Sequence, residues 1–408
     1  MITLTTYADA RDAFRSRDLR QSLYDAGDRL MHGVIVNLHG DEHLARRRLE
    51  NRLFRRDTFA WYERERIPHI IDAVLREPMA AGHGDLLALA RRTMMTLSMD
   101  VAGVDLPPGA DEFERIYGLM DDLARASTVA HAVGDTQAII DAGDLALDAF
   151  DREFFEPSLQ RRRALVEQFE RSEIDEPDLP RDVLTTLLRN HDRLELADAT
   201  VLREVAYFPW VGSHSTSHQL VHAMHHMFEW MANDPSSRTT LEHDDITRQR
   251  FVHESMRLHP ASPVALRIAD DDVTLRSGRV LPRGEPITIS VHDANRDPIV
   301  FPGHADRFDP YREVGDGVAP WGLSFGHGTH ACLGQELASG LEPDEALDHQ
   351  HNHLLGSVAV MAGVMLRAGA RPDPHDPARL DATTTRIVWE RYPVRFHADD
   401  PAAATVRQ

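Results

Sequence analysis

The chain has 408 residues, of which 42% are hydrophobic, and its 45 basic residues stand against 66 acidic ones, for a formal net charge of −21. This composition supplies enough apolar surface for a folded core and excludes an intrinsically disordered chain. A negative charge of this size opposes nonspecific binding to nucleic acid and to anionic membranes, so we expect neither as a partner.

Helices are expected from the start of the chain to about residue 260, because apolar residues recur there with helical spacing between capping residues and prolines. Two examples are 41–56 and 85–104. The segment 197–231 predicts one unusually long helix, which Pro209 and Gly212 are expected to kink.

Short strands and turns are expected in the remainder of the chain. The segments 272–275 and 280–291 have the residue pattern of strands, and 383–396 predicts a hairpin. Helices followed by small sheets, without regular βαβ alternation, exclude a doubly wound sheet. Because no linker divides the chain, we expect a single domain over 1–408, mainly α with minor β sheets.

The cellular setting is predicted from hydropathy. Charged residues interrupt the first fourteen positions where a signal peptide needs an apolar run. The most apolar later stretch, "LLGSVAVMAGVML", has about 13 residues, short of the roughly 20 that span a bilayer. We therefore expect a cytoplasmic protein with no membrane partner. We also expect the protein to be a monomer.

Histidines are concentrated in "VGSHSTSHQLVHAMHH", residues 211–226, where His214, His218 and His222 recur every fourth position on one helical face. Such spacing can chelate zinc or copper, but metal sites normally add a third ligand and supporting carboxylates. The nearby string "HESMRLH" has Arg257 where the zinc motif HExxH needs its second histidine. The histidines therefore do not complete a recognisable metal motif.

Cys332 is the one cysteine of the chain, so it forms no internal disulfide. In "SFGHGTHACLGQELA" it stands between a glycine-rich loop and a helix expected to begin near Leu333. Amide groups at such a helix start favour a thiolate, which is a strong axial ligand for haem iron. Gly334 would let a flat group approach the backbone. The alternative for a lone cysteine is a buried, inert side chain.

The loop resembles the haem-binding signature FxxGx(H/R)xCxG of the cytochrome P450 family, soluble bacterial type. The matching residues are Phe325, Gly326, Gly328, His330, Cys332 and Gly334. Glu254 and Arg257 look like the ExxR pair of the family, and Arg307 resembles the third member of the same buried ion network. The resemblance implies haem b (iron protoporphyrin IX) ligated by Cys332, inside a triangular prism of helices between the long kinked helix and the cysteine loop.

The resemblance also implies cations for the haem propionates. His43 and Arg47 match the HxxxR pattern of a helix that faces the haem, Arg267 matches the arginine after the ExxR helix, and His330 completes the set. Phe325, Gly326 and Gly334 are expected to contact the same cofactor.

The long helix departs from the family where it crosses the oxygen-binding side, which usually reads (A/G)Gx(D/E)T. With Gly212 aligned, His214 stands in place of the acid and Ser215 in place of the threonine. We expect His214 and Ser215, with Thr216 close by, to form a variant proton relay. The alternative is that His214 only packs or contacts substrate.

The implied activity is monooxygenation of a small, largely apolar molecule, of the kind found in secondary metabolism. It would use O2 and electrons from NAD(P)H, delivered by a ferredoxin reductase and a ferredoxin. The predicted substrate pocket includes Val211, Gly212, Val264 and Tyr392. Two alternatives remain: a peroxide-driven or rearranging haem-thiolate enzyme, because the acid is missing, and a non-catalytic haem-binding protein.

A basic patch on the helix at 41–56 is the expected ferredoxin site, with a merely solvated helix face as the alternative. Its members are Arg46, Arg48, Arg52, Arg55 and Arg56. Relative to the family we also expect a shortened segment before His43, an insertion near 340–356 and a disordered tail at 399–408.

Overall fold

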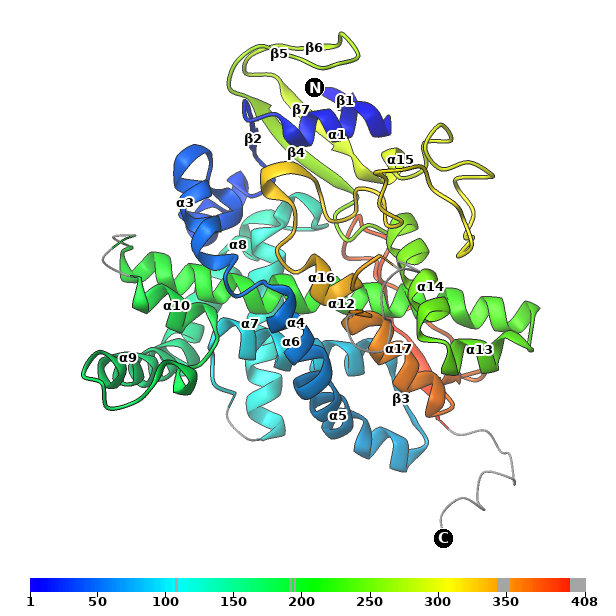
Figure 1. The fold of residues 1–408 in the computed structure, drawn as a ribbon, viewed down its shortest axis with the longest axis horizontal. Helices are drawn as coiled ribbons and strands as arrows, with labels where there is room; N and C mark the ends of the chain where they lie inside the picture. The colour runs from blue at the N-terminus through cyan, green and yellow to red at the C-terminus, as the bar shows by residue number, and fades with distance from the viewer. Residues whose placement is uncertain (107–108, 191–192, 194–195, 343–352, 397–408) are drawn as a thin grey trace.

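One helix, α12 (Asp198–Asn233), runs 36 residues across the molecule and organises the fold (Figure 1). The computed structural model describes residues 1–106, 109–190, 193, 196–342 and 353–396. The expected long helix is confirmed, with Pro209 inside it. Its many apolar residues are buried because neighbouring helices pack around it, and α6 makes the most extensive of these contacts.

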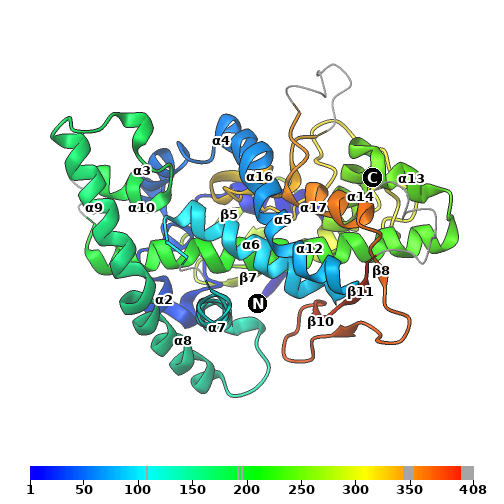
Figure 2. The same cartoon turned by 90° about the horizontal axis from the view of Figure 1, so that it is seen from below.

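Helices dominate the described chain, so the expectation of a mainly α fold is confirmed (Figures 1 and 2). Besides α12 they are α1 (Tyr7–Arg15), α2 (Asp28–Met31), α3 (Gly40–Glu50), α4 (Arg56–Trp61), α5 (Ile67–Ala81), α6 (Leu86–Ala102), α7 (Ala110–Ser127), α8 (Thr136–Phe150), α9 (Glu156–Glu170), α10 (Val183–Arg189), α13 (Ser237–His243), α14 (Asp245–Leu258), α15 (Val291–Ala294), α16 (Gln335–Ser339) and α17 (Ser357–Arg367).

Small sheets flank the helices. The largest has the order β1-β7-β4-β2 and brings the start of the chain against residues 264–290, at the top of Figure 1. Its strands are β1 (Ile2–Leu4), β2 (Leu19–Gln21), β4 (Val264–Ala269) and β7 (Pro286–Ser290), and a two-stranded sheet pairs β5 (Val273–Thr274) with β6 (Val280–Leu281). The others combine β3 (His83–Asp85), β8 (Arg371–Pro372) and β11 (Pro393–Arg395), and β9 (Arg379–Leu380) with β10 (Trp389–Arg391).

Two expected elements differ from the structure. The hairpin predicted over 383–396 is wrong, because β10 pairs with β9 while β11 pairs with β3 and β8. The helix predicted over 41–56 ends at Glu50, and a turn separates it from α4. The two strands within 383–396 do form, but each pairs with segments distant in the chain.

The segments expected to depart from the family are only partly described. Before His43 the chain forms β1, α1, β2 and α2. At the described ends of the expected insertion, the Leu341 N–H donates to the Leu354 carbonyl at 2.9 Å. Residues 343–352 of the insertion and the expected tail at 399–408 lie outside the described residues. Across the described ranges, no helix combines the length and apolar character needed to cross a membrane.

Candidate functional site

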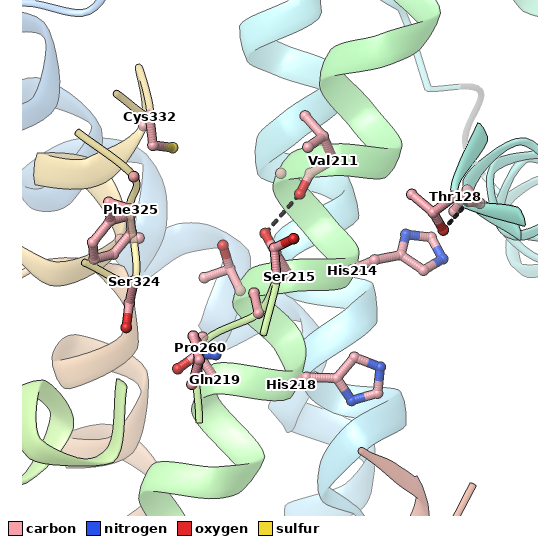
Figure 3. Close-up of a pocket in the computed structure, with 18 of the residues that line it drawn as sticks. Thr128, Val211, His214, Ser215, His218, Gln219, Pro260, Ser324, Phe325 and Cys332 are labelled. Atoms are coloured by element: carbon pink, nitrogen blue, oxygen red, sulfur yellow. Dashed lines mark hydrogen bonds between the residues drawn. The ribbon is translucent and has the colours of Figure 1, made fainter. Parts of the chain in front are cut away.

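Cys332 stands on a tight loop that faces a large cavity (Figure 3). Gly326 and Gly328 have positive φ angles of 68° and 73°, which explains why the loop needs glycine at both turns. The Cys332 N–H donates to the Phe325 carbonyl at 2.9 Å and closes the loop. The cysteine side chain is accessible from the cavity, which has a volume of about 860 Å³.

The surroundings of the Cys332 sulfur act on its pKa in opposite directions. Burial within the protein raises the thiol pKa, whereas the Gly334 N–H and the nearby Arg47 guanidinium lower it. Burial prevails, so the loop amides alone do not produce the thiolate that the sequence pattern led us to expect. A metal cation at the sulfur would deprotonate it outright, because a coordinated thiol loses its proton.

Basic side chains without acidic partners surround the cysteine loop. Arg267 is 5% exposed, and burial lowers its pKa to about 10. Arg47 donates to the Ala331 carbonyl at 2.9 Å. Among the described residues neither arginine forms a salt bridge, although both line the cavity. A buried cation without a counter-ion is costly, so this wall is suited to an anionic group.

Two stacked imidazoles complete this wall. The rings of His43 and His330 lie 4.0 Å apart at 17°. Burial lowers the pKa of His43 to about 4 and, together with His43, that of His330 to about 3. Both rings are therefore neutral near pH 7 and can each donate one N–H.

The residues present fit a haem group. The cavity is lined by the Cys332 sulfur, which could ligate the iron of a porphyrin. It is also lined by Arg47 and Arg267, which have no acidic partner among the described residues and could bind the two propionates. At Gly334 a Cβ atom would meet nothing within 4 Å, so the backbone there is open to a flat group. Phe325, Gly326, His330 and Gly334 all line the same cavity.

The buried ion network differs from its prediction in one residue. Arg257 donates to both carboxylate oxygens of Glu254, at 2.6 and 2.7 Å. The further arginine at Glu254 is Arg312, whose Nε lies 3.3 Å from Oε1 and whose side chain is 3% exposed. Arg307 is exposed and contributes only its backbone carbonyl, so the prediction for Arg307 is wrong. Both arginines lie in an irregular segment, where spacing does not reveal which side chain turns inward.

The same network reaches the cysteine loop through Asn295, which sequence reasoning missed. Arg257 donates to the Asn295 carbonyl at 2.6 Å. The Asn295 side chain accepts from the Leu323 N–H at 2.7 Å and donates to the Ser324 hydroxyl at 2.9 Å. Because Leu323 and Ser324 directly precede the loop, the network can hold the loop in place.

Helix α12 forms the opposite wall, with Ser215 on the side of Cys332 (Figure 3). The Ser215 hydroxyl donates to the Val211 carbonyl at 2.7 Å. Gly212 permits close packing, since a Cβ atom there would lie 2.7 Å from Ser98 Oγ on α6. Val211, Gly212 and Thr216 line the cavity.

His214 projects away from Cys332, toward α7 (Figure 3). Its Nε2 lies 3.3 Å from Asp121 Oδ1, and its Nδ1 lies 3.0 Å from the Trp210 carbonyl. Burial raises the pKa of Asp121, but its hydrogen bond to His214 and the nearby arginines outweigh burial, so the net shift is downward. An acid therefore does reach this position, from a different helix, and the sequence pattern of α12 could not reveal it.

Two predicted pocket residues do not line the cavity. In β4, Ala265 lines it instead of Val264, because successive strand side chains point to opposite faces. Tyr392 is 3% exposed, and its hydroxyl lies 3.0 Å from His225 Nδ1. The lining near the end of the chain comes from Asp381, residues 383–388 and Glu390.

Two further histidines, His222 and His226, connect α12 to other segments. His222 Nε2 lies 2.9 Å from the Ile387 carbonyl, and His226 Nε2 lies 3.0 Å from His259 Nε2. Burial lowers the pKa of His222 to about 4 and that of His226 to about 3. Within the described part of the chain, no group of three or more His, Cys, Asp or Glu side chains could hold a metal ion.

One arginine of the expected basic patch is buried and not on the surface. Arg46 is 2% exposed, and its Nη1 lies 2.8 Å from Glu204 Oε2, so its assignment to a docking surface is wrong. Arg46 thus reaches from α3 to Glu204 on α12. Arg48, Arg52, Arg55 and Arg56 remain exposed.

Two buried carboxyl groups share the Arg46 guanidinium. Burial raises the pKa of Glu204 to about 7, although Arg46 and the Ile35 N–H oppose this rise. Burial and the neighbouring Glu204 raise the pKa of Glu50 well above its usual value. The cluster therefore links α3 to α12 and holds a proton at neutral pH.

Replacing Glu204 with glutamine should remove part of the pH dependence of stability. The native state holds the Glu204 proton up to about pH 7, whereas the unfolded chain releases it near the ordinary value of 4.5. The stabilisation is therefore fully present below pH 4.5 and is lost as the pH rises through 7. Urea unfolding should show the free energy of wild type falling relative to Glu204→Gln over this interval. A difference between wild type and variant that stays constant over this interval would contradict the assignment.

Comparisons with known proteins agree with this geometry. The family model described as cytochrome P450 matches residues 9–340. Cytochrome P450 BJ-3 of Bradyrhizobium diazoefficiens is 30% identical over 269 residues, which cover 64% of this chain and 57% of that protein. Cyclooctat-9-en-7-ol 5-monooxygenase of Streptomyces melanosporofaciens is 28% identical over 281 residues, which cover 63% and 56%. The matches span little more than half the length of these relatives.

The fold has solved counterparts as well. CYP109E1 from Bacillus megaterium, crystallised with testosterone, superposes with a TM-score of 0.73 at 17% identity, covering 97% of this chain and 92% of that one. This likeness concerns the fold alone, whereas the family model covers most of the chain and includes the cysteine loop. The chain therefore belongs to the cytochrome P450 family.

Proposed function

We propose that the chain is a haem-thiolate monooxygenase that inserts one oxygen atom of O2 into a small organic substrate. The observation that carries the proposal is the Cys332 sulfur opening onto a cavity whose opposite wall presents the Ser215 hydroxyl. Cys332 would hold the iron of haem b, and Arg47, Arg267, His43 and His330 would bind its propionates. Bound haem would supply the redox chemistry that activates oxygen.

A CO-difference spectrum of the reduced, purified protein tests the proposal. We expect the red-shifted band that a thiolate ligand produces. Product should then form with NAD(P)H, a ferredoxin reductase, a ferredoxin and O2. The name of the Streptomyces relative supports monooxygenation. Absence of the red-shifted band would contradict ligation by Cys332.

A peroxide-driven enzyme is the second candidate, because α12 itself carries no acid beside Ser215. Peroxide would bypass the delivery of electrons and of the protons that accompany them. Turnover with peroxide, combined with none from reductase, ferredoxin and O2, would select this candidate.

For electron supply, we propose that the exposed arginines of α3, of α4 and of the turn between them bind an acidic ferredoxin. Arg56 Nη2 lies 3.7 Å from Glu336 Oε1, and Glu336 belongs to the short helix that follows Cys332. The patch is therefore close to the proposed iron ligand, and its charge is opposite to that of the partner. Its members are Arg48, Arg52, Arg55 and Arg56.

Proton delivery is proposed to involve Asp121, His214 and Ser215. Both the Asp121 carboxylate and the Trp210 carbonyl accept hydrogen bonds, so a protonated His214 can donate to both at once. Asp121 is 36% exposed, which gives this pair access to solvent protons. The Ser215 hydroxyl, bonded to Val211, lies on the side where a proton would be used.

Replacement of His214 by phenylalanine should reduce the fraction of electrons that appear in product and should change the pH profile. Positioned proton transfer contributes roughly 10²- to 10⁴-fold, so turnover should fall within that range. Asp121→Asn should give a similar loss, and the double variant should lose no more than either single one, because the two act as a unit. Unchanged coupling and pH dependence in His214→Phe would exclude the relay.

A further inference from the structure

Residues 383–388 close one end of the cavity, where they meet the turn at Val129–His131. The Thr385 N–H donates to the His131 carbonyl at 3.1 Å. On the other side, His222 Nε2 lies 2.9 Å from the Ile387 carbonyl. These two contacts hold the backbone on either side of Arg386. Figure 2 shows α7 and β10 on the same side of α12.

This end of the cavity gathers hydrogen-bond donors that lack partners. Arg386 Nε and Arg91 Nε are shielded from solvent and form no hydrogen bond among the described residues. The same holds for His131 Nε2 and His218 Nδ1. All four residues line the cavity, and His218 projects from α12 on the side away from Cys332 (Figure 3).

The acidic residues lining the cavity in the described ranges are already engaged. Asp121 binds His214. Asp381 accepts from both the backbone and the hydroxyl of Thr383, at 2.7 Å each. Glu390 Oε1 lies 3.6 Å from Arg379 Nη2. Neither Arg386 nor Arg91 forms a salt bridge with any of them.

The electrostatic effects of Arg386 are visible in its neighbours. Burial and the Arg386 charge lower the pKa of His131 to about 4. Burial, together with a set of charges that includes Arg91 and Arg386, lowers the pKa of His218. The histidines are therefore neutral donors beside two permanent cations, and an anion placed among them would gain charge-assisted hydrogen bonds.

We propose that Arg386, with Arg91, His131 and His218, binds a carboxylate of the substrate. A carboxylate is the anion that the planar guanidinium of arginine recognises through two parallel hydrogen bonds. The substrate is thus an amphipathic acid, with its apolar body directed toward the Val211 and Ser215 side of the cavity. This inference rests on the proposed oxygenation at Cys332 and adds the class of substrate and the end by which it is held.

The test compares decanoic acid, methyl decanoate and 1-decanol as probes of the haem-loaded protein. Binding is measured by calorimetry and, in parallel, by the change in the haem spectrum. Decanoic acid should bind about tenfold or more tightly than the two neutral probes, as expected for a hydrogen bond to a charged group. Equal affinities of the acid and its ester for the wild-type protein would overturn the proposal without any variant.

The variant Arg386→Gln tests whether Arg386 binds the carboxylate of decanoic acid. It should weaken binding of decanoic acid by roughly ten- to a hundredfold and leave 1-decanol unchanged. Arg283→Gln, which removes an exposed charge that does not line the cavity, is the control and should leave all three affinities unchanged. A loss of affinity that is equal for acid and alcohol would contradict a carboxylate site. Binding measured by calorimetry does not depend on the thiolate band. A failure of the haem-thiolate assignment can therefore be distinguished from a failure of the proposed carboxylate site.

Discussion

Replacement of Cys332 by serine is expected to abolish the red-shifted CO band and all oxygenation. Serine keeps nearly the same shape and can accept the hydrogen bond from the Gly334 N–H that the sulfur now receives. It does not provide the thiolate, whose electron donation favours cleavage of the O–O bond. The measurement is the CO-difference spectrum together with product formation at matched protein concentration.

The result of this experiment has one interpretation, because Cys332 is the one cysteine of the chain. No other thiol can replace the ligand in the variant. Unfolding by urea serves as the control and should be nearly unchanged for the protein without haem, since the serine is a conservative change in the loop. A red-shifted band that persists in Cys332→Ser would refute the assignment of the ligand.

Replacement of Arg257 by leucine is expected to lower the free energy of unfolding by about 3 to 5 kcal/mol. The Arg257 side chain is fully buried, and its loss would leave the Glu254 carboxylate with one arginine and the Asn295 and Ala305 carbonyls without their donor. Denaturant unfolding monitored by tryptophan fluorescence and by circular dichroism measures the change. The cysteine loop should also bind haem less tightly, because Asn295 connects the network to Leu323 and Ser324.

A matched pair of variants tests which arginine completes the network. Arg312→Gln should cost about 1 to 3 kcal/mol, because the Arg312 side chain is buried and donates to Glu254 and to backbone carbonyls. Arg307→Gln should change stability by no more than about 0.5 kcal/mol, because the Arg307 side chain is exposed. The reverse order would restore the prediction made from the sequence.

The candidate site was predictable wherever a short, contiguous pattern encodes it. The glycines of the cysteine loop must adopt positive φ angles, and this requirement is visible in the sequence itself. Glu254 and Arg257 stand three positions apart on one helix, so their contact is also local. The family resemblance depends on such patterns, and the family match confirms it.

Predictions failed where the contact joins segments far apart in the chain. Arg46 is buried against Glu204, which is 158 positions away in the chain. The burial of Arg46 therefore depends on a contact that no local pattern shows. His214 meets an acid 93 positions away, on α7. Tyr392, which was predicted to line the pocket, instead contacts His225, 167 positions away.

The sequence by itself determined the cysteine loop, the long helix and the family, because each depends on backbone geometry or helical spacing within a few turns. The tertiary structure alone decided which side chains meet across the cavity. The Asp121–His214 pair, the place of Arg312 in the ion network and the unpartnered donors around Arg386 each require several elements to pack at once. Packing between distant segments selects which residues are buried, paired or left facing the cavity, and no local pattern contains that information.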